Sequence, residues 1–127
     1  MSDRPVIVAL TEEADGSDIR VTITLEWQDQ RHSGQALGEA NLPHRPRLAA
    51  EATLRAVEHL TGDTVPMDLL AVATANLGDV RVALAQVRLG EAGETLVGTA
   101  LMADTEPSVA AVRAVMSALN RRLGLLL

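Results

Sequence analysis

The sequence predicts an α+β domain built from two βββα repeats, in which an antiparallel sheet carries both helices on one face and a pseudo-two-fold axis relates the halves. Residues 18–27 alternate strictly between apolar and polar side chains, and an alanine-rich helical segment ends each half. The same order of patterns restarts after residue 62. Because 127 residues is the usual size of one domain, we expect a single domain over 1–127, with repeats over about 5–62 and 66–124.

The first half contains three strand signals and one helix signal. Residues 18–27 are typical of a strand with one buried face. The acidic segment 11–18 reads as an exposed loop between the first two strands. Pro46 stands where helices often begin, and Gly62 fits the position just after a helix end. The predicted elements are strands 6–10, 18–27 and 31–39, and a helix over 47–60.

The second half repeats this order, and its turns and helix ends have clearer sequence signals. Gly78 and Asp79 predict a tight turn, and Thr105 followed by Pro107 has the form of a helix start. Gly124 marks the predicted end of the last helix. The predicted elements are strands 67–77, 80–89 and 95–103, and a helix over 108–123.

The two halves also match residue by residue. Adding 62 to Ala49, Ala52 or Ala56 of the first helix gives an alanine of the second helix, and Gly34 corresponds to Gly98 with an offset of 64. Small residues at this spacing allow a helix to lie close on a sheet. We therefore interpret the chain as an internal duplication.

Composition excludes several classes of function. The net charge of −6 and the absence of a basic cluster argue against nucleic acid as a partner. The chain has no cysteine, which excludes disulfides, thiol catalysis and thiolate metal sites, and it has no lysine for Schiff-base chemistry. No apolar run is long enough to span a membrane and no signal peptide is visible, so we expect a cytoplasmic protein.

No catalytic or metal-binding motif is present. Ser33, Ser108 and Ser117 lack the context of a nucleophilic serine, and the three histidines do not have metal-ligand spacing. The acidic residues of segment 11–18 read as exposed, which does not suit acid–base catalysis. We expect a protein that is not an enzyme and that has no cofactor and no metal ion.

A family resemblance is carried by the last third of the chain. A glycine strand over 97–100, the acidic residue Asp104 and the stretch Ala118-Leu119-Asn120 follow one another there. Together with the βββα–βββα order, they resemble the C-terminal allosteric domain of 2-isopropylmalate synthase and its relatives. The resemblance implies a dimerising regulatory domain with a pocket for a small amino acid or a related metabolite. This chain departs from the family at residues 38–43, where one glycine and a proline replace a glycine-rich turn.

Two groups of residues are candidates for ligand binding. Arg45 and Arg47 flank a predicted helix start, where free N–H groups and guanidinium charge could hold an anion. The alternative is an ordinary solvated helix entry. The family resemblance adds Gly98, Asp104 and Thr105.

Exposed apolar residues suggest an interface. The single aromatic residue Trp27 and the tail Leu125, Leu126 and Leu127 are the candidates. The function that we predict is a non-catalytic regulatory or assembly module that homodimerises and binds a small metabolite or anion. The alternative is a structural protein that covers a face of another cytosolic protein. A small enzyme with an active site at an interface is the third hypothesis.

Overall fold

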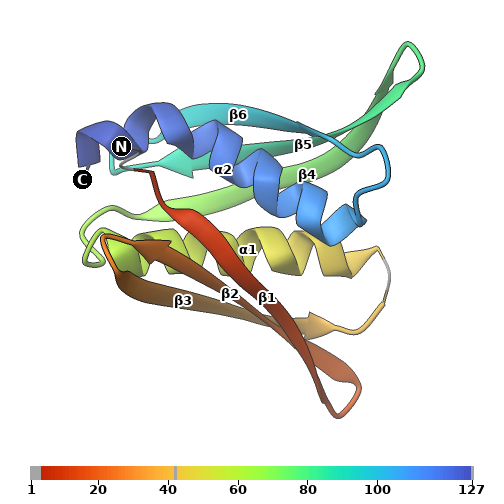
Figure 1. The fold of residues 1–127 in the computed structure, drawn as a ribbon, viewed down its shortest axis with the longest axis horizontal. Coiled ribbons are helices and arrows are strands. Elements are labelled where there is room, and N and C mark those ends of the chain that lie inside the picture. The colour runs from red at the N-terminus through yellow and green to blue at the C-terminus, as the bar shows by residue number, and fades with distance from the viewer. Residues whose placement is uncertain (1–3, 42, 127) are drawn as a thin grey trace.

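A computed structural model of the protein describes residues 4–41 and 43–126. It contains six strands and two helices in the order βββα–βββα (Figure 1), which confirms the predicted α+β class and the two repeats. The elements are β1 (Val6–Asp15), β2 (Asp18–Trp27), β3 (Gln30–Glu39), α1 (His44–Leu60), β4 (Met67–Leu77), β5 (Val80–Leu89), β6 (Glu94–Leu101) and α2 (Pro107–Leu126).

The strands form two separate antiparallel sheets rather than the one sheet expected. Sheet A has the order β1-β2-β3, and sheet B has the order β4-β5-β6. Each sheet is a meander whose neighbouring strands are joined by short turns. The helix α1 contacts β2 and β3 of sheet A and also β4 of sheet B. Because α1 occupies the space between β3 and β4, these two strands do not pair.

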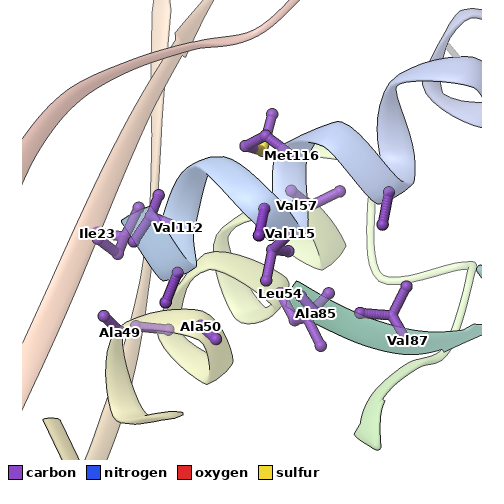
Figure 2. Close-up of a cluster of buried hydrophobic side chains, with 14 of the residues drawn as sticks. Ile23, Ala49, Ala50, Leu54, Val57, Ala85, Val87, Val112, Val115 and Met116 are labelled. Atoms are coloured by element: carbon purple, nitrogen blue, oxygen red, sulfur yellow. The ribbon is translucent and has the colours of Figure 1, made fainter. Parts of the chain in front are cut away.

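Both helices belong to one hydrophobic core. The helix α1 packs on β2 and β3, α2 packs on β5 and β6, and the helices contact each other. Figure 2 shows side chains from both halves in this core, among them Ile23 of β2, Val57 of α1, Val115 of α2 and Val87 of β5. Alanine, valine, leucine and methionine supply most of the buried volume, as the near absence of aromatic residues requires.

Two glycines set the distance between each helix and its sheet. A Cβ added to Gly34 would overlap backbone atoms of Ala52 and Ala56 in α1. A Cβ added to Gly98 would overlap Ala114 and Ala118 in α2. The two pairs of alanines are related by the offset of 62, so the same close approach occurs twice.

The first strand of each sheet carries the same irregularity. The register of β1 on β2 shifts between Ile7 and Ala9, and the register of β4 on β5 shifts between Leu69 and Ala71. These positions are also related by 62. The matching bulges and the matching glycine contacts show that the repeat extends from the sequence into backbone geometry.

Four predicted boundaries were wrong by two or more residues, and one of them is the end of the last strand, which lies at Leu101 instead of residue 103. The segment 11–18 is not a loop, because β1 continues to Asp15 and pairs with β2 up to a tight turn at Gly16. The helix α1 begins at His44, three residues before the predicted start at residue 47, so Pro46 lies inside its first turn. The helix α2 continues past Gly124 to Leu126, because one glycine lowers helix stability without ending the helix.

Candidate functional site

The predicted anion site lies at the N-terminus of α1, but both of its arginines already have partners. Arg45 forms an ion pair with Glu12 of β1. Arg47 lies near Glu51 one turn later in the helix, with 3.7 Å between Nε and Oε1. The positive charge at this helix start is therefore balanced by carboxylates of the same chain.

The partner of Arg45 was expected to be exposed, and that expectation was wrong. Glu12 lies opposite Val21 in the register of β1 on β2, on the face of sheet A that turns toward the helices. Its side chain is only 18% exposed, and its Oε2 atom is buried. Sequence reasoning missed this residue because it placed Glu12 in a loop, where alternation has no meaning.

The second group of predicted ligand residues lies before α2. Asp104 is exposed and Thr105 is half-buried in the turn between β6 and α2. Both helices begin at the same end of the molecule (Figure 1), so the two groups lie at that end. Among the described residues, no hydrogen bond or ion pair joins Arg45 or Arg47 to Asp104 or Thr105. Gly98 lies elsewhere, and its role in the structure is the close contact with α2.

A polar cleft of about 430 Å³ lies between β6 and α2. Thr95, Thr99 and Ser117 contribute hydroxyl groups, and the Ser117 hydroxyl accepts a weak hydrogen bond from the Thr99 N–H at 3.4 Å. Arg122 at the rim donates to both carboxylate oxygens of Glu94, at 2.9 and 2.7 Å. The hydrogen bonds from Arg122 lower the pKa of the Glu94 carboxyl. The charges in the cleft are therefore neutralised within the chain.

The outer faces of the two sheets differ in character. In β2 the residues Ile19, Val21, Ile23 and Leu25 are buried, so the alternate residues point outward. In β5 the buried residues are Ala83, Ala85, Val87 and Leu89, and again the alternate residues point outward. The strand registers extend these outward positions to the neighbouring strands.

The outer face of sheet A is polar and carries charges at both ends, whereas that of sheet B is mainly apolar, with Gln86, Thr95 and Thr99 as uncharged polar residues. In the strands of sheet B the outward-pointing charged residues are Asp68 and Arg88, which lie opposite each other at one end. Outward-pointing charged residues of sheet A are Glu13, Asp15, Asp18, Arg20, Glu26, Arg31 and Glu39. Outward-pointing apolar residues of sheet B are Ala71, Ala73, Ala75, Leu77, Val80, Val82, Leu84, Val97 and Leu101. We call this surface the sheet B outer face.

The sequence contains a signal for the sheet B outer face. Residues 80–89 are apolar at the outward positions Val80, Val82 and Leu84 and also at the buried positions between them. Residues 18–27 are apolar at the buried positions alone. A strand that is apolar on both sides in a protein of this size predicts that both sides become covered.

The interface residues predicted from the sequence lie apart from this face. Trp27 is half-buried at the end of β2. Leu125 is 80% exposed near the end of α2. The side chain of Leu126 and the whole of Leu127 lie outside the described residues. The prediction of an interface at these positions stays a prediction.

Histidine and acidic side chains are dispersed over the described part of the chain. Within it, no three histidine or acidic side chains are grouped so that they could hold a metal ion. No described helix is both long and apolar enough to cross a membrane.

No model of a known protein family matches the chain, and no curated protein matches it.

Proposed function

We propose that the protein is a non-catalytic, cytoplasmic assembly or regulatory module that acts as a homodimer. One observation carries this proposal. The sheet B outer face is mainly apolar and exposed, whereas the equivalent face of sheet A carries charges at both ends and uncharged, mostly polar residues between them. A contiguous apolar surface of this kind on a small domain marks a site of protein contact.

The physical argument concerns solvent exposure. Leu77, Val97 and Leu101 are 76%, 62% and 64% exposed. Covering apolar surface stabilises a complex by roughly 25 cal/mol per Å² before the costs of association. The core of this protein is built from small side chains, so an interface adds burial that the chain alone does not supply.

A small-molecule effector has weaker support than self-association. At the predicted anion site, Arg45 is already paired with Glu12. The polar cleft beside β6 contains an arginine that is paired with Glu94. Both sites would have to break an internal ion pair in order to bind an anion.

Sedimentation equilibrium over a wide range of concentration tests the proposal. We expect a reversible monomer–dimer equilibrium with the dimer predominant at high micromolar concentration. A protein that stays monomeric at that concentration would contradict self-association and would favour a different protein as the partner of this face. Thermal-shift measurements with amino acids and phosphate test the effector, because a ligand that binds the folded state must raise the melting temperature.

A further inference from the structure

We infer that two copies stack the sheet B outer face against itself, about a two-fold axis that runs parallel to β5. The inference rests on the proposed homodimer and adds the orientation of the two copies at this surface. In this arrangement β4 of one copy lies opposite β6 of the other, and the two β5 strands face each other. Face-to-face sheets pack in this way about 10 Å apart, with their strands roughly aligned.

The first argument is the shape of the face. The outward positions of β4 form a stripe of small side chains, Ala71, Ala73 and Ala75. The outward positions of β6 on the other edge include the larger Val97 and Leu101. An axis parallel to β5 places the large side chains of one copy over the alanine stripe of the other. An in-plane axis perpendicular to β5 would place alanine over alanine and leave gaps.

The second argument is the position of the charges. Asp68 and Arg88 lie opposite each other at the end of the face where β4 begins. At the other end, Leu77 and Val80 are paired beside the turn. An axis parallel to β5 brings each end against its own copy, so that the Arg88 side chains of the two copies approach each other at an exposed end of the face, with one Asp68 beside each arginine. The perpendicular axis would place Arg88 over the apolar end, at the cost of removing its charge from water.

The third argument is area. Three strands of about ten residues, at about 3.3 Å per residue and about 4.8 Å between strands, give a face of roughly 500 Å². This value is close to the roughly 600 Å² per partner at the lower end of stable interfaces. A second copy supplies an apolar face of equal size, as a two-fold interface requires.

A pair of matched substitutions tests the surface. Leu84 lies at the middle of the face, opposite Ala73 and Thr99. Its counterpart in sheet A, with an offset of 62, is Thr22, which lies opposite Thr11 and Gln35. We expect Leu84→Arg to raise the dimer dissociation constant at least 100-fold, and Thr22→Arg to change it less than threefold.

Far-ultraviolet circular dichroism and the melting temperature check that both variants fold. Val97→Asp and its counterpart Ser33→Asp form a second matched pair in case Leu84→Arg does not fold. A native dimer that both sheet B variants leave intact would overturn the inference while the proposed homodimer stands. A native protein that is monomeric would overturn the proposed homodimer itself.

Cross-linking tests the orientation, because the chain has no cysteine and each introduced thiol is unique. With a short bis-maleimide we expect Leu84→Cys to cross-link to itself. We expect a mixture of Ala75→Cys and Leu101→Cys to give mainly the mixed product, because β4 faces β6 of the partner. Ala75→Cys alone cross-linking as efficiently as the mixture would overturn the parallel axis.

Discussion

Sheets A and B have the same strand order, the same bulge and the same close contact with a helix, yet their outer faces have opposite character. The inner faces are alike because each must accommodate a helix backbone against a glycine, Gly34 in one sheet and Gly98 in the other. The outer faces are free of that constraint. Equivalent positions hold Thr22 and Leu84, or Asp15 and Leu77. Internal packing therefore preserves the repeat, and the two surfaces are free to serve different roles.

The helices are also anchored differently. In the first half, Arg55 donates to the Met67 carbonyl at 2.6 Å, and the Glu58 carboxylate accepts from the Met67 N–H at 3.0 Å. With an offset of 62, the counterpart of Met67 is Pro5, which has no N–H to donate. The counterpart of Glu58 is Asn120. A carboxylate, that of Glu58, is thus present at this helix position only in the first half, where the Met67 N–H donates to it.

The largest effect on stability should come from Gly34 and Gly98, at which each sheet contacts its helix in the same way. Gly98→Val places a side chain where α2 backbone atoms already lie, and Gly34→Val does the same against α1. We expect each to lower the free energy of unfolding by roughly 3 kcal/mol or more, since backbone cannot move aside cheaply. Urea denaturation measures this. Gly124→Ala is the control, because open space surrounds that position. If only one of the two valine substitutions lowered the free energy of unfolding strongly, the close contact between helix and sheet would differ between the halves.

An intermediate effect should come from the anchor that distinguishes the halves. Glu58→Ala removes the acceptor of the Met67 N–H and the ion-pair partner of Arg55, whose Nε lies 3.0 Å from Oε1. We expect a loss of about 2 kcal/mol, because a partly buried donor then lacks its partner. Asn120→Ala, at the equivalent position, should cost clearly less. Equal losses in chemical denaturation would contradict the asymmetry.

The smallest effect should come from the exposed pair Glu94–Arg122. The hydrogen bonds from Arg122 lower the pKa of Glu94 in the folded protein. A lowered folded-state pKa means that the pair stabilises the fold above the ordinary carboxyl pKa, and that this contribution is lost as the pH falls through the folded value. NMR titration should show the Glu94 pKa rising toward its ordinary value in Arg122→Gln. An unchanged pKa in that variant would exclude Arg122 as the cause.

Most of the fold follows from local patterns in the sequence. The strands over 18–27, 67–77 and 80–89 have the predicted bounds, because alternation and tight turns are local signals. The separation into two sheets depends on where α1 packs, which no local pattern contains. The extension of β1 through its acidic end depends on pairing with β2, which outweighs the low strand preference of Glu12 and Glu13.

Less of the candidate site could be predicted. Arg45 was predicted to hold an anion at the helix start, whereas in the structure it pairs with Glu12, which lies 33 positions earlier in the chain in a segment predicted to be a loop. The sheet B outer face was readable in principle from residues 80–89. It becomes visible once the register shows that the outward positions of β4 and β6 are apolar as well.

The shared direction of the two helices has an electrostatic consequence. Both begin at the same end of the molecule (Figure 1), so the positive ends of their peptide dipoles lie together. The first turn of neither helix contains an acidic residue. Glu12 reaches the start of α1 through Arg45, and Asp104 and Glu106 precede α2 in the chain. The two side-by-side helices therefore concentrate a positive field at this pole of the protein, where Asp104 and Glu106 lie just before α2.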